Sequence, residues 1–350
     1  MKSKKVYLSV IVLLIFIMFT PILETTGSIN NNHIITLEAP KPILVLGGTQ
    51  GSGINEFDDP DGIAVDDDGM IYAGDTGNLR VQVYFPNGTY SHVMEGFDDI
   101  RNNEAQGMAF DSEGYLWVND QLGHKIQKFH KNGTHMGYIN VTGAIENQGL
   151  AIDSQDNFYV VDTALQKVFK LSKNGTKITE FGSGLQVPES ILIDELNQTI
   201  YVCSESGKNV RMYNYISLEN IGTFGSFNGE PEGITMDSEY RLIVNDEGRN
   251  SVAIFHSNRT ILGYLGSKGS ELGQFDSQDG ICFDHNRQRL IVADQGNYRI
   301  QVFNYTEVLE YAKTYVPPTT ETTGKGSPSF ELYSIIILFL LIPILRKGKL

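Results

Sequence analysis

The chain has 350 residues, of which 27 are basic and 42 acidic, so its formal net charge is −15 at neutral pH. Residues 1–20 and 325–350 each contribute +3, which leaves −21 on residues 21–324. A field of that sign repels phosphate, so the composition argues against nucleic acid as a partner.

The first residues, Met1 to Lys5, are basic, and an unbroken apolar run follows from Val6 to Phe19. A basic start before an apolar run of this length is typical of a secretory signal peptide. Because no A-x-A cleavage site follows, an uncleaved signal anchor stays open as the alternative. We therefore expect residues 1–28 to be a signal peptide or signal anchor, and the chain to act outside the cell.

Beyond this segment one pattern recurs six times: a small residue, an apolar strand, an Asp, a turn, a second apolar strand and a third strand. The Asp that closes the first strand recurs at intervals of 41 to 47 residues, as Asp66, Asp111, Asp153, Asp194, Asp237 and Asp284. A period in the low forties that contains only short strands is typical of a β-propeller with one blade per repeat.

The two ends of the repeat region predict how the ring closes. The stretch from Val45 to Phe57 resembles the one that precedes the sixth repeat, so residues 43–46 form a fourth strand that belongs to no N-terminal repeat. Pairing it with the third strand of the sixth blade, residues 299–303, removes an open sheet edge. Residues 307–311, which follow directly, are the alternative closing strand.

Two of the six copies carry a recognisable motif. Residues 75–84 read DTGNLRVQVY and residues 294–303 read DQGNYRIQVF, and both resemble NHL repeats. The resemblance covers about residues 43–303. The fourth copy departs from the motif, with Ser190 in place of Gly and Ser204 in place of Asp. This resemblance implies an all-β, six-bladed β-propeller of the NHL type.

We interpret the Asp residues that repeat in the blades as architecture. The Asp that closes each first strand can accept hydrogen bonds from turn amides. A second Asp ends the second strand in five copies (Asp75, Asp120, Asp162, Asp246 and Asp294), with Arg80 and Arg299 as candidate partners in their own blades. An active site needs different groups from different blades, so a residue that is identical in every copy is expected to be structural.

The residue before the Gly of the first strand varies instead. First strands are innermost in a propeller, so these six side chains are expected to ring one mouth of the central channel: Asp61, Gln106, Gln148, Glu189, Glu232 and Asp279. Oxygen ligands that converge on an axis suit a hard cation such as Ca²⁺, and a polar, metal-free mouth is the alternative. Six-bladed hydrolases and lactonases with a calcium ion in the channel suggest an enzyme as the alternative hypothesis. In such an enzyme the metal would polarise an ester.

Cysteines and histidines point to no further site. Cys203 and Cys282 fall in non-adjacent blades, so we expect two small buried thiols and no disulfide. The histidines are scattered, with His130 and His256 near the ends of third strands and His285 in a turn. No histidine joins the mouth, so a zinc site is not expected.

Seven N-x-[ST] sequons mark candidate N-glycosylation sites. They are Asn87, Asn132, Asn140, Asn174, Asn197, Asn258 and Asn304. Five of them, all except Asn140 and Asn197, fall at the turn that follows the third strand, where Asn-Gly is also a hairpin signal.

The C-terminal end predicts a tether. Residues 313–329 are rich in Thr, Pro and Gly, which indicates an unpacked stalk. Residues 330–350 contain an apolar stretch of about 21 Å as a helix, short of the roughly 30 Å hydrocarbon layer, before a basic tip. This arrangement resembles the C-terminal sorting signals of archaeal surface proteins, and a plain membrane tail with a cytoplasmic C-terminus is the alternative.

Together these features predict an all-β, six-bladed propeller of four-stranded antiparallel blades over residues 43–312, closed by an N-terminal strand. We expect a monomeric, membrane-anchored, extracellular glycoprotein that acts as a non-catalytic binding module for an extracellular protein or glycan. The alternative is a calcium-dependent hydrolase or lactonase, or a lyase, with its site at the channel mouth. No catalytic residue is assigned, and calcium is the one cofactor that the mouth would suit.

Overall fold

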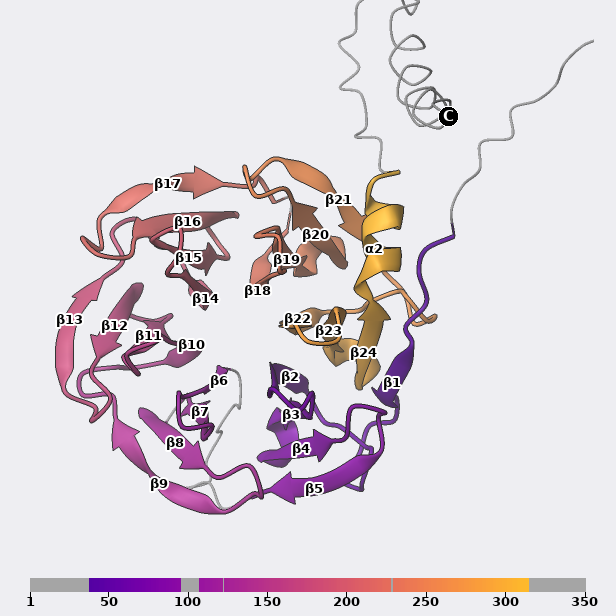
Figure 1. Cartoon of the computed structure of the whole chain (residues 1–350), viewed down its shortest axis with the longest axis horizontal. Coiled ribbons are helices and arrows are strands. Elements are labelled where there is room, and N and C mark those ends of the chain that lie inside the picture. Colours follow the sequence, from indigo (N-terminus) through magenta and orange to yellow (C-terminus); the bar gives the residue numbers. More distant parts are fainter. Residues whose placement is uncertain (1–37, 96–106, 122, 228, 315–350) are drawn as a thin grey trace, which may run out of the picture. The chain divides into compact units, whose positions relative to one another are not determined.

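The computed structural model describes residues 38–95, 107–121, 123–227 and 229–314. Within these residues, six four-stranded antiparallel sheets are arranged as blades around a central axis (Figure 1). The first strand of each blade is innermost, and the first strands of successive blades contact one another around the whole ring. The predicted signal segment, the stalk beyond residue 314 and the apolar tail lie outside the described residues.

Each blade follows the chain from the axis outward. Blade 1 contains β2 (Pro60–Val65), β3 (Ile71–Asp75), β4 (Arg80–Tyr84) and β5 (Tyr90–Met94); blade 2 contains β6 (Met108–Phe110), β7 (Leu116–Asp120), β8 (Lys125–Phe129) and β9 (His135–Asn140). Blade 3 contains β10 (Asn147–Ile152), β11 (Phe158–Asp162), β12 (Lys167–Leu171) and β13 (Lys177–Phe181); blade 4 contains β14 (Pro188–Asp194), β15 (Thr199–Ser204), β16 (Asn209–Asn214) and β17 (Asn220–Phe224). Blade 5 contains β18 (Pro231–Met236), β19 (Leu242–Asp246), β20 (Ser251–Phe255) and β21 (Ile261–Leu265); blade 6 contains β22 (Gln278–Asp284), β23 (Arg289–Asp294), β24 (Arg299–Asn304) and β1 (Leu44–Gly47). The 3-10 turns η1 (Thr76–Asn78), η2 (Glu247–Arg249) and η3 (Gln295–Asn297) join second to third strands in blades 1, 5 and 6.

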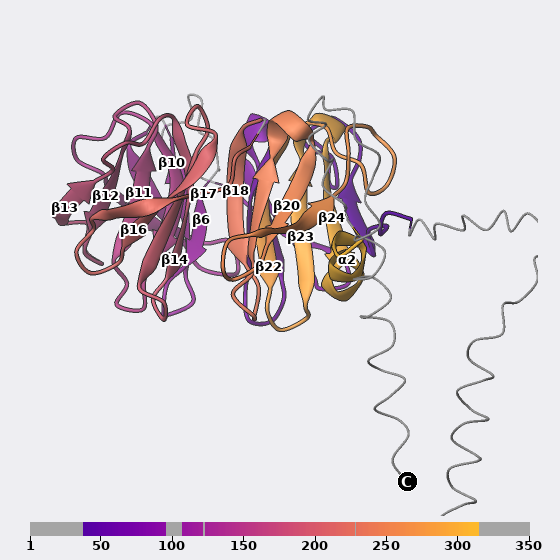
Figure 2. The same cartoon turned by 90° about the horizontal axis from the view of Figure 1, so that it is seen from above.

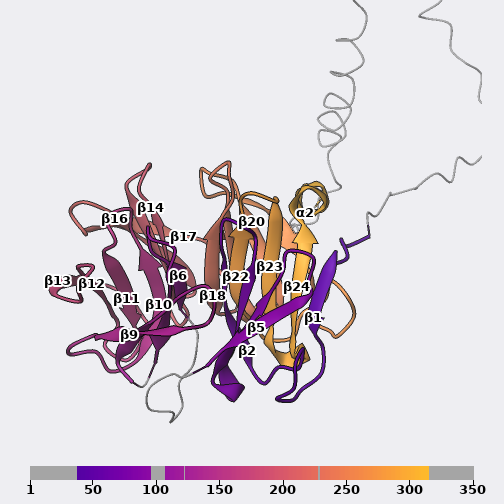
Figure 3. The same cartoon turned by 60° about the horizontal axis from the view of Figure 1, so that its bottom comes forward.

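The sixth blade is assembled from both ends of the described chain. β1 pairs antiparallel with β24, with Leu44 opposite Val302 and Gly47 opposite Arg299. The alternative closing strand was wrong, because residues 307–311 lie in helix α2 (Tyr305–Ala312). Figure 3 shows β1 and α2 beside β24. Since β1 already occupies the outer edge of this blade, the chain after β24 leaves the sheet as a helix.

This closure also corrects the predicted position of one sequon. Asn304 does not lie in a hairpin between third and fourth strands; it ends β24 and caps α2, accepting a hydrogen bond from the backbone N–H of Thr306. Its place in the repeat is equivalent to that of the hairpin sequons, but the chain that follows it is helical. Such a side-chain cap satisfies one of the amides that a helix N-terminus leaves unpaired.

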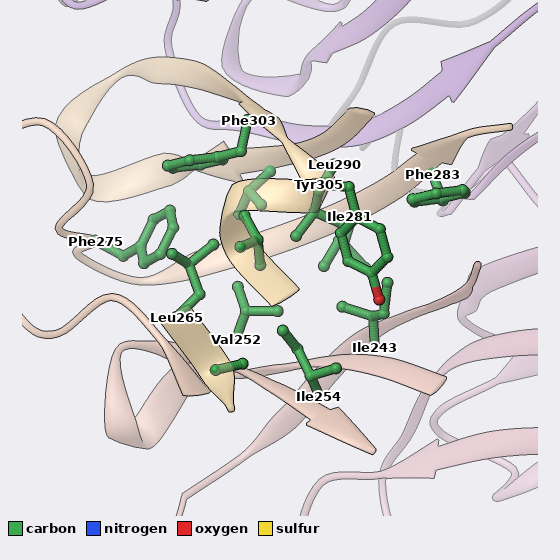
Figure 4. Packing of buried hydrophobic residues seen from close by; sticks show 13 residues of the cluster. Ile243, Val252, Ile254, Leu265, Phe275, Ile281, Phe283, Leu290, Phe303 and Tyr305 are labelled. Atoms are coloured by element: carbon green, nitrogen blue, oxygen red, sulfur yellow. The ribbon is translucent and has the colours of Figure 1, made fainter. Parts of the chain in front are cut away.

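The apolar core is divided into six clusters, and each cluster lies between two neighbouring blades. Alternate side chains of a strand point to opposite faces of its sheet, so every blade serves two clusters. Figure 4 shows the cluster between blades 5 and 6, where Ile254, Leu265 and Phe275 pack with Phe303 and with Tyr305 from α2. Truncating one such fully buried side chain to alanine costs about 2–5 kcal/mol.

The small residue of each first strand is explained by contact between blades. A Cβ added to Gly149 would lie 2.6 Å from the carbonyl oxygen of Glu189, and one added to Gly280 would lie 2.1 Å from that of Asp61. The inner strands therefore approach so closely that there is no room for a larger side chain. Ser190 is accommodated because its hydroxyl donates a hydrogen bond to the carbonyl oxygen of Glu232.

The two cysteines are both free, and only one is fully buried. Cys203 lies in β15 and is inaccessible, whereas Cys282 in β22 is half-buried and lines the central cavity. The expectation that both are core residues is therefore wrong for Cys282. Burial raises the pKa of the Cys282 thiol to about 12, which favours its protonated form. Among the described residues no helix is long and apolar enough to cross a bilayer.

Candidate binding site at the channel mouth

The central cavity has a volume of about 190 Å³ and is lined by first strands from all six blades. Five of the predicted mouth residues line it: Asp61, Gln148, Glu189, Glu232 and Asp279. The sixth, Gln106, lies outside the described residues. The same cavity is also lined by an apolar set, namely Ile63, Met108, Leu150, Ile191, Ile234 and Ile281. The cavity thus combines a polar mouth with an aliphatic wall.

One side of the mouth is a chain of hydrogen bonds between amides and a carboxyl group. The Nε2 of Gln121 donates to Oε1 of Gln148 at 3.0 Å, and the Nε2 of Gln148 donates to Oε2 of Glu189 at 2.9 Å. Gln121 follows β7 and Gln148 lies in β10, so this chain links blades 2, 3 and 4. It fixes the orientation of the Glu189 side chain.

From Glu189 onward the mouth concentrates carboxyl groups, because Glu232 and Asp279 follow in the next two blades. Burial, followed by the charges of Asp279 and Glu205, raises the pKa of Glu189 to about 9, although the hydrogen bond from Gln148 opposes the shift. Burial and the neighbouring Asp279 and Glu189 raise the pKa of Glu232 to about 11. Burial and mutual repulsion thus disfavour ionisation of both carboxyl groups.

A second tier of acids surrounds these two. Burial raises the pKa of Glu205, and the charges of Glu230 and Glu247 raise it further. The pKa of Glu247 is likewise raised by burial and by Glu230. We call the set Glu189, Glu205, Glu230, Glu232 and Glu247 the acidic arc. Its members come from blades 4 and 5.

The structure tests the metal hypothesis at the level of geometry. Within the ranges described above, no group of three or more His, Cys, Asp or Glu side chains is arranged to hold a metal ion. The cavity lining that the structure describes contains no histidine. His130 and His256 follow β8 and β20, and His285 follows β22, so all three lie at the end of the blades opposite the mouth.

The repeated carboxylates at that opposite end have many partners. Asp153 accepts hydrogen bonds from the backbone N–H groups of Gln155 and Asn157 and from the hydroxyl of Tyr215. The closing Asp of every other blade likewise accepts a turn amide. Asp284 binds Arg289 at 2.7 Å. These groups hold turns in place.

The NHL-like motif also has a structural role. Arg80 binds Asp75 at 2.6 Å and Arg299 binds Asp294 at 2.6 Å, both through Nε. Each arginine also donates to several backbone carbonyls of the loop that precedes its blade. The motif therefore clamps a loop to its blade in copies one and six, where the sequence keeps all of its members.

Sequence reasoning missed part of the acidic arc. Glu189 and Glu232 belong to the ring of mouth residues predicted from the sequence, whereas Glu205, Glu230 and Glu247 do not. A signal existed for Glu247, because it directly follows the Asp of a second strand, as Gln121 does. Nothing in the repeat pattern marks Glu230, which precedes β18.

The comparisons with known proteins agree with the fold. A family model described as NHL repeat matches residues 57–84. Among curated proteins, none matches the sequence. A virginiamycin B lyase from Staphylococcus aureus aligns with a TM-score of 0.56 at 14% identity over 74% of this chain and 98% of its own.

Two further solved structures are similar in fold. A gluconolactonase from Xanthomonas campestris aligns with a TM-score of 0.60 at 14% identity, covering 76% of this chain and 95% of its own. The WD40 propeller domain of Doa1 aligns with a TM-score of 0.55 at 12% identity, covering 73% and 80%. At these identities the likeness extends to the fold alone. The match to the NHL model covers one repeat, residues 57–84, and the six-bladed ring agrees with the fold that this resemblance implies.

Proposed function

We propose that the chain is a cell-surface binding module that contacts an extracellular protein or glycan through the channel mouth. The observation that carries the proposal is the acidic arc beside an open cavity, where burial and neighbouring carboxyl groups raise the pKa values of Glu189 and Glu232. A rigid ring that presents convergent polar groups over an aliphatic wall is a typical small-group binding site. The predicted signal segment and the acidic composition are consistent with this extracellular role.

The group that fits best is a cation with an aliphatic stem, such as a lysine or arginine side chain of the partner. An ammonium or guanidinium group inserted between Glu189 and Glu232 would favour ionisation of one of the two carboxyl groups and so displace its proton. The stem would then pack on apolar residues such as Ile191 and Ile234 below. Because carboxyl groups must ionise, binding of a cation releases protons.

Calorimetry tests this directly. A lysine hexapeptide is titrated into the full-length protein at pH 7 in two buffers of different ionisation enthalpy. We expect release of about one proton for each peptide bound, by linkage. Glu189→Gln and Glu232→Gln should weaken binding about tenfold, or 1.4 kcal/mol. Glu113→Gln, the same change at an exposed turn at the other end of the blades, is the control.

The same titration with a neutral oligosaccharide is the competing arm. Binding of the sugar without proton release, together with no binding of the peptide, would reject a cation as the ligand group and favour a glycan. Failure of both ligands to bind at the mouth would contradict the binding-module proposal.

One observation favours the enzyme alternative. A carboxyl group with a pKa of about 9 that is oriented by Gln148 is suited to donate a proton to a leaving group at neutral pH. Two structural neighbours are named as a lyase and a gluconolactonase. Turnover of virginiamycin B or of gluconolactone, with and without Ca²⁺, would support this function if Glu189→Gln abolished it and Glu113→Gln did not.

A further inference from the structure

Five sequon asparagines gather at the end of the blades opposite the mouth. Strands one and three of a blade run in the same direction, so the residue that follows a third strand lies at the end where the first strand finishes, whereas the mouth residues stand where the first strand begins. Figure 2 shows the strands running between these two ends of the ring. The five, which we call the rim asparagines, are Asn87, Asn132, Asn174, Asn258 and Asn304.

The rim asparagines share one local geometry. In each, the side-chain Oδ1 accepts a hydrogen bond from the backbone N–H of the Thr two residues later, at 3.0 to 3.2 Å. Four of the five are exposed and Asn304 is half-buried. With Oδ1 engaged, the Nδ2 amide nitrogen faces away from the backbone, and in the described residues it donates to no protein acceptor. The turn therefore presents that nitrogen to solvent.

The other two sequons differ in this respect. Asn197 donates its Nδ2 to Oδ2 of Asp194 at 2.8 Å, and the Thr199 of its sequon is only 3% exposed. Asn140 is the last residue of β9, a strand that runs back towards the mouth, and it pairs with Lys125 in the ladder. Its exposed side chain makes none of the turn contacts found at the rim asparagines. Geometry thus divides seven identical motifs into five and two.

We propose that the folded propeller is N-glycosylated at the rim asparagines and left bare at Asn140 and Asn197. The donor would be an oligosaccharide carried by a polyprenol diphosphate. A bond forms between Nδ2 and the anomeric carbon, the bond from that carbon to the diphosphate oxygen breaks, the lipid diphosphate leaves, and the amide proton passes to a base. The inference requires export of the chain but is independent of the ligand at the mouth.

The consequence is a ring with two unlike faces. Glycans at the rim asparagines would cover the periphery of one face at five of the six blades. The acidic mouth on the other face would stay uncovered, because the one sequon on a strand that runs towards it, Asn140, is not used. A partner could then approach the ring from one side only.

Glycopeptide mapping of the full chain purified from its own cells tests the proposal. We expect glycan mass on the five rim peptides, unmodified peptides for Asn140 and Asn197, and loss of one glycan mass in Asn87→Gln but not in the matched Asn140→Gln. Equal occupancy of all seven sites would overturn selection by the folded geometry. An intact mass equal to that of the bare polypeptide would overturn the modification itself.

Discussion

Carboxyl groups lie at both ends of the propeller's first strands, but their surroundings differ. Those at the closing end are hydrogen-bonded, whereas those at the mouth are buried beside other acids. At the closing end, Asp153 is surrounded by hydrogen-bond donors, and Asp284 is bound by Arg289. At the mouth, Glu189 and Glu232 stand against one another and against Asp279, and their pKa values rise. In blades 4 and 5 the first strand therefore begins with a destabilised carboxyl group and closes with a hydrogen-bonded one, Asp194 or Asp237.

The comparison separates architecture from function. A carboxylate that recurs in every blade and is saturated by local donors stabilises a turn, and its blade needs it whatever the protein binds. A carboxyl group that varies between blades and is buried beside other acids lowers the stability of the fold. Such unfavourable arrangements are typical of sites where a bound ligand relieves the repulsion. Three predictions test whether this division is correct.

The largest effect is expected at the closing end. Arg289 is 6% exposed, donates to Asp284, and also donates to the carbonyl oxygen of Pro86 in blade 1. Arg289→Met leaves a buried carboxylate without the cation that donates hydrogen bonds to it, at the junction of blades 6 and 1. We expect a loss of about 3–5 kcal/mol in the free energy of unfolding, measured with urea.

The neighbouring Arg287 supplies the control. It lies 3.9 Å from the same carboxylate but is about one-third exposed. Arg287→Met should cost at most about 1 kcal/mol, because exposed ion pairs contribute little. Equal losses for the two variants would show that proximity to Asp284, and not burial of the pair, sets the energy.

The mouth should show an unusual dependence of stability on pH. A raised carboxyl pKa means that the folded state holds a proton which the unfolded state has lost above about pH 4.5. Stability is therefore full below that pH and falls as the pH rises towards the folded pKa of about 9 for Glu189, by at most about 1.4 kcal/mol per pH unit for each group. Wild-type protein should accordingly melt at a higher temperature at pH 6 than at pH 8.

Two histidines contribute to the pH dependence of stability with the opposite sign, so the contribution of the mouth must be measured as the difference between wild type and a mouth variant. Burial lowers the pKa values of His92 and His285, so their contribution is lost as the pH falls. Glu189→Gln combined with Glu232→Gln removes only the mouth component, so the gain on acidification should shrink and the variant should be the more stable protein at pH 8. If the variant had the same dependence of melting temperature on pH as wild type, repulsion between the carboxyl groups of the mouth would not explain that dependence.

Most of the ring was predictable because the repeat is explicit in the sequence. The apolar pattern of each copy marks its strands, and the stretch before the first copy matches the one before the sixth. The mistaken alternative at residues 307–311 ignored a helical signal: Tyr305, Val308 and Ala312 are spaced for one helix face and are all buried, and Asn304 stands at the cap. The alternative closing strand was inferred only because these residues directly follow the third strand, and the helical spacing was not considered.

The site was predictable in position but not in character. Five mouth residues line the cavity because their place in the repeat fixes their place on the axis. Their pKa values depend on how deeply Glu189 and Glu232 are buried and on acids from other turns, such as Glu247. These long-range interactions leave no local pattern in the sequence. A ring of oxygen ligands for a cation and a pair of carboxyl groups that repel each other therefore have the same sequence signature.

The smallest effect is expected at the least supported closing Asp. Asp194 accepts only from the backbone and side-chain nitrogens of Asn197, and it forms no ion pair within the described residues. Asp194→Asn keeps the acceptor for the backbone amide, so we expect a cost of about 0.5–1 kcal/mol in urea unfolding. Asp153→Asn should cost about 1–3 kcal/mol, because both of its oxygens accept bonds from buried or half-buried donors. If the two variants lost the same stability, the number of donors around a closing Asp would not explain its role, and its repeated position at the end of the first strand would.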